Sequence, residues 1–120
     1  MNKHAEAQQK NEPVQLNKKL HQTRIDIEEG RRVDLVELIN QQLADTLSLY
    51  SHTKQAHWNV KGIHFNQMHE LFDMLGGTVF PYIDMLAERV TSLGGTAEGT
   101  VHMASANSTL DEFPHGPGDG

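Results

Sequence analysis

Apolar residues recur at three- and four-residue steps along two stretches of the chain, which is the pattern of one face of an α-helix. The first stretch begins near Arg31 and ends near Lys61 and Gly62, because glycine is the usual residue just past a helix end. Its apolar stripe consists of Val36, Ile39, Leu43, Leu47 and Tyr50. His57 continues this stripe seven residues after Tyr50, so an ionisable side chain lies on the face predicted to be buried.

A second helical stretch follows, and Gly94 and Gly95 end it. Its apolar positions are Phe65, Met68, Phe72, Leu75, Val79, Ile83, Leu86, Val90 and Leu93. Pro81 lies inside this stretch and cannot donate a hydrogen bond to the Gly77 carbonyl, so we expect a kink there. The two stretches together predict a helical hairpin.

The two ends of the chain lack this periodicity. Met1 to Lys19 is polar and contains Pro13, and the last ten residues include five Gly or Pro. We therefore expect a flexible tail over residues 1–22 and one all-α domain over residues 23–120, made of the hairpin and a loop-rich C-terminal end. A hairpin alone buries little apolar surface, so further helices should come from another subunit or from sequence that is absent here.

Composition excludes several classes of protein. Ten Lys and Arg against 16 Asp and Glu give a formal charge of −6, which argues against a uniformly basic nucleic-acid binder. The chain has no cysteine, which excludes disulfides and thiolate metal sites. No apolar run approaches the roughly 18 residues of a membrane span, and the polar N-terminus lacks a signal-peptide core. We expect a cytoplasmic protein, with the nucleoid as an alternative location.

Four polar residues share one stripe of the second predicted helix, beside its apolar face. With His69 at zero and about 100° per residue, Asp73 falls at about 40°, Asp84 at about 60° and Glu88 at about 100°. Asp73 and Asp84 lie about 16 Å apart along the helix, too far for one ion with bonds of about 2.0–2.6 Å. The spacing therefore gives two half-sites, one with His57, His69 and Asp73 and one with Asp84 and Glu88.

Two antiparallel copies of the helix, related by a two-fold axis, would bring each half-site against the complementary one. The composite of two imidazoles and three carboxylates suits iron or manganese. The same residues also permit a simpler interpretation, in which Asp84 and Glu88 form a solvated, ion-paired edge and His57 is a hydrogen-bonded core histidine.

Three stretches resemble the signatures of the Dps family, the DNA-binding proteins from starved cells, which are small ferritin-like proteins. They are KQAHWNVKGIHFNQMHELFD, YIDMLAERVTSLGGTAEGT and LADTLSLY, and the resemblance extends from about Thr23 to Leu110. Residue by residue, the family's ferroxidase ligands correspond to His57, His69, Asp73, Asp84 and Glu88. Trp58 matches the tryptophan beside the family's iron site, where it either donates electrons or packs as an aromatic side chain.

The resemblance implies a ferritin-like helical-bundle subunit and a catalytic site for iron, Fe2+ and Fe3+, between two-fold-related subunits. It implies oxidation of ferrous iron by hydrogen peroxide or O2, storage of ferric mineral and, commonly, a dodecameric cage. Many members also bind DNA through lysine-rich tails and protect it from oxidative damage. The expected partners are therefore iron, peroxide, further copies of this chain and, weakly, DNA.

The sequence departs from the family pattern in three main places. Gly76, Gly77 and Pro81 interrupt a helix that is normally regular, between the two half-sites. The first 19 residues carry a net charge of only +2, which predicts weak DNA binding. The family's two further bundle helices have no counterpart here, which suggests a truncated chain. Two alternatives stay open: a nucleoid-associated DNA-binding protein with secondary ferroxidase activity, and an inactive helical-hairpin fragment.

Overall fold

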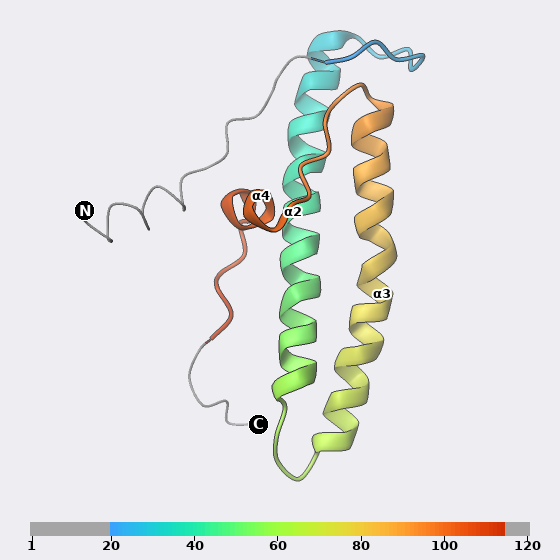
Figure 1. The fold of residues 1–120 in the computed structure, drawn as a ribbon. Helices are drawn as coiled ribbons and strands as arrows, with labels where there is room; N and C mark the ends of the chain where they lie inside the picture. The colour runs from blue at the N-terminus through green and yellow to red at the C-terminus, as the bar shows by residue number, and fades with distance from the viewer. Residues whose placement is uncertain (1–19, 115–120) are drawn as a thin grey trace, which may run out of the picture.

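The computed structural model describes residues 20–114, in which two long antiparallel helices form a hairpin and a short helix packs against one of them (Figure 1). The long helices are α2 (Glu29–Asn59) and α3 (Phe65–Ser92), and the short one is α4 (Val101–Asn107). No strand occurs between residues 20 and 114. The all-α class and the helical hairpin predicted from the sequence are confirmed.

Both long helices end close to the predicted positions. Gly94 follows α3 with a φ of +86°, and its N–H donates to the Thr91 carbonyl at 3.0 Å. A Cβ atom at this position would collide with the carbonyl oxygen of His21, so only glycine allows the chain to turn here. The helix α3 continues across Pro81, so the proline does not end it, and the predicted kink stays a prediction.

Besides Leu43 and Ala44, which are buried farther along α2, a buried apolar cluster lies at one end of the hairpin, where α2 begins and α3 ends. Val36, Val90 and Leu93 form it and are at most 7% exposed. The surrounding, partly buried side chains are Leu20, Ile25, Ile27, Leu35, Ile39 and Ala97. This end is therefore the packed end of the molecule.

The segment before α2 is tied across the packed end by hydrogen bonds. The His21 N–H donates to the Gly94 carbonyl at 2.7 Å, and the Thr23 hydroxyl donates to the Ser92 carbonyl at 2.6 Å. Arg32 donates to the Leu93 carbonyl at 3.0 Å. Residues 20–22 of the predicted tail are thus held against the end of α3, whereas residues 1–19 lie outside the described residues.

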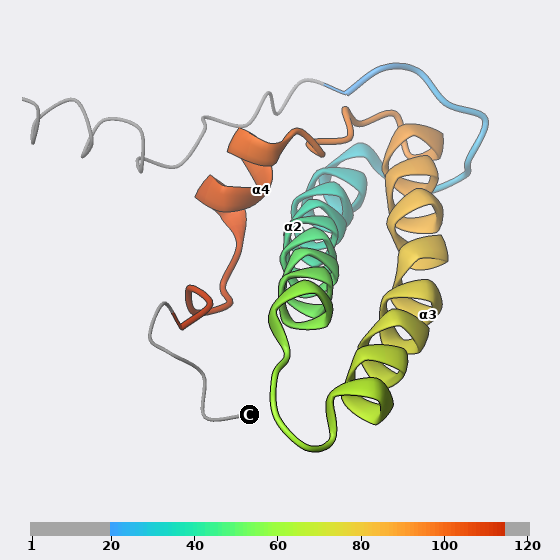
Figure 2. The same cartoon turned by 60° about the horizontal axis from the view of Figure 1, so that its bottom comes forward.

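The helix α4 was not expected from the sequence, and it lies on the side of α2 away from α3 (Figure 2). The side chain of Thr100 caps it by accepting the Met103 N–H at 3.2 Å, and Ala104 is buried against α2. The loop between α3 and α4 is held by Asn40, which donates to the Thr96 carbonyl and accepts from the Glu98 N–H, both at 3.0 Å.

Large apolar side chains remain exposed on the hairpin. On α3, three of them lie on the side of the helix away from Asp73 and Asp84: Leu71, Leu75 and Tyr82. Within residues 20–114, no helix is both long enough and apolar enough to cross a membrane.

Candidate metal centre

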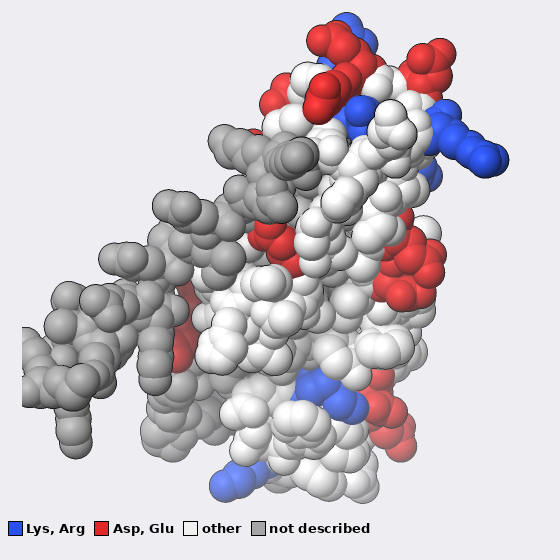
Figure 3. Space-filling model, turned by 45° about the horizontal axis from the view of Figure 1, so that its top comes forward, with Lys and Arg blue, Asp and Glu red and all other residues white. Residues whose placement is uncertain are grey.

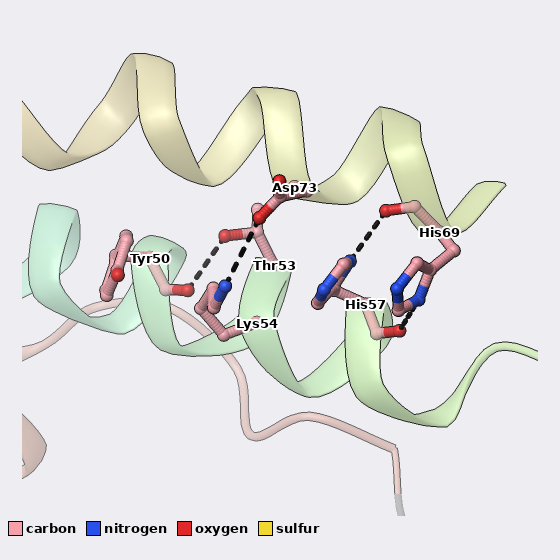
Figure 4. A network of polar contacts seen from close by, with 6 residues as sticks. All are labelled: Tyr50, Thr53, Lys54, His57, His69 and Asp73. Atoms are coloured by element: carbon pink, nitrogen blue, oxygen red, sulfur yellow. Dashed lines mark hydrogen bonds and ion pairs between the residues drawn. The ribbon is translucent and has the colours of Figure 1, made fainter. Parts of the chain in front are cut away.

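His57 and His69 meet at the loop end of the hairpin, where α2 ends and α3 begins (Figure 4). Their rings stack with centroids 3.7 Å apart and planes 22° apart. The Nδ1 atom of His57 lies 2.6 Å from the His69 carbonyl oxygen, and Nδ1 of His69 lies 2.8 Å from the His57 carbonyl oxygen. Each imidazole is therefore hydrogen-bonded to the backbone of the other helix.

The end of α2 explains one of these bonds. The carbonyl of His57 is among the last four of the helix, which lack donors within the helix, so the His69 ring supplies the missing donor. The carbonyl of His69 has a second lone pair available for the His57 ring.

These contacts fix the chemistry of both rings. A carbonyl oxygen only accepts hydrogen bonds, so Nδ1 of each ring carries the hydrogen and donates. The lone pair of each neutral imidazole is then on Nε2. One ring nitrogen held by a backbone carbonyl and the other free is the arrangement of metal-binding histidines, so His57 and His69 can both coordinate a cation through Nε2.

Asp73, one helical turn beyond His69, does not join the histidine pair in the single chain. Its Oδ1 atom lies 3.4 Å from the ammonium of Lys54 on α2 (Figure 4). No group of three His, Asp or Glu side chains in the described part of the chain is arranged to hold a metal ion. The histidine half of the first predicted half-site is formed, and its carboxylate is paired with a lysine instead.

The second predicted half-site lies farther along α3. Asp84 and Glu88 are one turn apart, and both are exposed. Their distance along the helix from Asp73 places them away from the histidine pair of the same chain. Within one chain, the two half-sites therefore remain separate, as the helical spacing predicts.

Two aromatic side chains belong to this end of the hairpin. Trp58 is 66% exposed, and its ring centroid lies 5.8 Å from the Lys54 ammonium. Phe65 stacks on the outer side of the pair, with its ring centroid 5.2 Å from that of His69. The apolar stripe of the sequence contains Phe65, whereas the only signal for Lys54 in the sequence is its one-turn spacing from Trp58. The contact of Lys54 with Asp73 depends on how the two helices align.

Comparisons with known proteins agree with this architecture. The family model described as a ferritin-like domain matches residues 36–118. The DNA protection during starvation protein of Agrobacterium fabrum is 38% identical over 96 residues, which cover 80% of this chain and 59% of that protein. The chain thus spans less than two thirds of that relative's length.

Solved structures show the same likeness. DpsC from Streptomyces coelicolor superposes with a TM-score of 0.79 at 32% identity, over 86% of this chain and 60% of that one. The Dps of Mycobacterium smegmatis gives a TM-score of 0.76 at 28% identity, over 82% of this chain and 59% of that one. From the matched domain, the named relatives and these structures together, the chain belongs to the Dps family of ferritin-like proteins.

Proposed function

We propose that this chain is an iron-oxidising and iron-sequestering protein of the Dps type, with ferrous iron as its substrate. The observation that carries the proposal is the histidine pair, because both rings are oriented by backbone carbonyls with Nε2 free. Asp73, Asp84 and Glu88 would complete the site as carboxylate ligands. Two imidazoles and three carboxylates form a ligand set that suits iron.

In this proposal, the complete site lies between two chains. One chain supplies His57, His69 and Asp73, and its two-fold partner supplies a copy of Asp84 and Glu88. Two imidazoles and one carboxylate from one chain leave room for an ion to accept the partner's two carboxylates. The absence of a three-ligand cluster between residues 20 and 114 of one chain is compatible with such sharing.

The ligand set also favours the proposed reaction. Carboxylates stabilise Fe(III) over Fe(II) and so lower the reduction potential of the bound iron. Two ferrous ions together reduce one hydrogen peroxide and two protons to two waters, and each iron loses one electron. Delivery of both electrons at one site avoids release of hydroxyl radical, and O2 is the alternative oxidant. In this proposal, Trp58, which is exposed and follows His57 in the sequence, would give an electron to an oxidant that escapes.

DNA protection belongs to the same proposal, because the Agrobacterium relative is named for protection of DNA during starvation. On the face in Figure 3, basic and acidic side chains of the described residues are interspersed. The lysines of the predicted arm lie outside the described residues. We therefore propose that protection works mainly through removal of iron and peroxide, with weak DNA binding, and that the protein assembles into a two-fold dimer and a larger cage.

Ferrous oxidation in the presence of peroxide tests the proposal. Replacement of both His57 and His69 by alanine should slow oxidation at least about tenfold, since loss of metal-site partners costs about 10–100-fold in metal affinity or activity. His102→Ala is the matched control, because His102 is exposed on α4 and should leave the rate unchanged. Oxidation by the double variant at the parental rate would show that this site is not the catalyst.

A further inference from the structure

Lys54 stands out because it is a cation placed against a proposed cation ligand. It lies on α2, one turn before Trp58, and its ammonium is 3.4 Å from Oδ1 of Asp73 (Figure 4). The Lys54 side chain is 24% exposed and that of Asp73 is 65% exposed. The lysine stem is thus largely covered, while the carboxylate that it reaches is open to solvent.

Three features hold the Lys54 side chain in place. Gly76 on α3 is buried, and a Cβ atom there would lie 3.4 Å from Cδ of Lys54, in ordinary van der Waals contact, so the lysine stem packs closely against α3 at this glycine. The Trp58 ring lies within the range of a cation–π contact. Asp73 supplies the opposite charge. The ammonium is therefore positioned by packing as well as by charge.

We propose that Lys54 is an internal competitor for the divalent cation, a positioning residue that holds Asp73 until the cation displaces it. This inference rests on the proposed function. The ammonium and an incoming cation seek the same carboxylate oxygen, and their like charges repel each other. Lys54 therefore lowers the affinity of the half-site made by His57, His69 and Asp73. Weak retention of the first ion suits a site that must pass its iron on after oxidation.

The competition predicts different effects on cation binding from two replacements of Lys54. Lys54→Met keeps most of the stem and removes the charge, so binding of a divalent cation should tighten about two- to fivefold, the range that an exposed ion pair supports. Lys54→Arg keeps the charge and should bind like the parent. The difference between Lys54→Met and the parent should shrink at high salt, because salt screens exposed charges.

The test is isothermal titration calorimetry of the full chain with Zn2+, which does not undergo redox chemistry. Heat from the proposed half-site is defined as the part that Asp73→Asn abolishes in each background, which removes the contribution of other histidines. Lys61→Met is the matched control, because Lys61 is an exposed lysine at the same end of the hairpin. Circular dichroism on each variant confirms folding, and Lys54→Gln replaces Lys54→Met if the latter does not fold.

Tighter binding by Lys54→Met, with parental binding by Lys54→Arg and Lys61→Met, supports the inference. A merely structural role for Lys54 predicts weaker binding by Lys54→Met and overturns it. Equal binding by the parent and Lys54→Met overturns the inference and leaves the proposed function intact. Absence of Asp73-dependent heat in both the parent and Lys54→Met overturns the inference and the proposed metal site together.

Discussion

The two ends of the hairpin differ in what holds them together. At the packed end, Val36, Val90 and Leu93 are buried, and the segment before α2 is bonded across the end of α3. At the loop end, two histidine rings bonded to two backbone carbonyls link the helices, and Trp58 and Asp73 are exposed. Apolar burial is the main source of stability, so the fold depends chiefly on the packed end, whereas the histidine half of the proposed site lies at the other end.

Under the proposed function, this separation has an advantage. The proposed ligand side chains at the loop end of the hairpin would face solvent and a second chain, because the fold does not need them buried. Substitutions at the two ends should therefore have different effects, which the following variants test in order of decreasing effect on stability.

The largest loss of stability should come from the packed end. Leu93→Ala removes a side chain that is only 3% exposed, and the cavity that it leaves should cost about 2–5 kcal/mol of unfolding free energy. Chemical denaturation monitored by circular dichroism measures the loss. Ile63→Ala is the control at the loop end, where the Ile63 side chain is 95% exposed and the unfolding free energy should change by no more than about 0.5 kcal/mol. Equal losses for both variants would contradict the proposed division.

A smaller loss should follow from the polar contact that fixes the loop after α3. Asn40 is 3% exposed and bonds both the Thr96 carbonyl and the Glu98 N–H. Asn40→Ala leaves both backbone groups without this partner, which should cost about 1–3 kcal/mol in the same denaturation experiment. Asn59→Ala is the control, because the exposed Asn59 side chain bonds only the Gln55 carbonyl. A neutral Asn40→Ala would mean that other groups hold the loop.

The smallest effects should be pH-dependent and opposite in sign at two carboxylates that hold the α4 region. Burial raises the pKa of Glu98, and the hydrogen bond from Asn107 offsets this only in part. Burial also acts to raise the pKa of Asp45, but hydrogen bonds from Thr109 and Ser108 outweigh it and lower the pKa.

The sign of each effect follows from these shifts. The raised pKa of Glu98 adds stability below its unfolded value, about 4.3, and this is lost as pH rises through the folded value. The lowered pKa of Asp45 adds stability above its unfolded value, about 3.9, and this is lost as pH falls. Glu98→Gln should therefore gain stability relative to the parent as pH rises above about 4.3, whereas Asp45→Asn should lose stability relative to the parent as pH rises from below to above about 3.9. Urea unfolding at pH values from below to well above these two pKa values measures both effects, and parallel curves for the variants and parent would refute the assignment.

The hairpin could be predicted from the sequence because its helices are long and their apolar residues follow the helical period. Two features could not be predicted. The helix α4 is only seven residues long and consists mainly of small side chains, so it has no apolar stripe, and its packing on α2 through Ala104 depends on the tertiary fold. The loop that leads to it depends on Asn40, a polar residue whose burial no periodicity indicates.

The candidate site was predictable only as a set of residues. Helical spacing placed His69 and Asp73 on one stripe and separated Asp73 from Asp84, which depends only on the rise per residue. The stacking of His57 on His69 depends on the connection between the helices. The pairing of Asp73 with Lys54 depends on the helix–helix register. Neither the geometry of the helix connection nor the helix–helix register can be read from the amino-acid sequence alone.

Mixed dimers test most directly whether the proposed iron site is shared between two chains. His57→Ala chains and Glu88→Ala chains, carrying different affinity tags, are co-expressed, and the mixed dimer is isolated by sequential purification. A two-fold dimer has two sites, so the mixed dimer has one site with both defects and one with none. Each homodimer should be nearly inactive, and the mixed dimer should recover about half of the parental rate of ferrous oxidation. Mixed dimers of verified composition that stay as inactive as the homodimers would contradict the shared site.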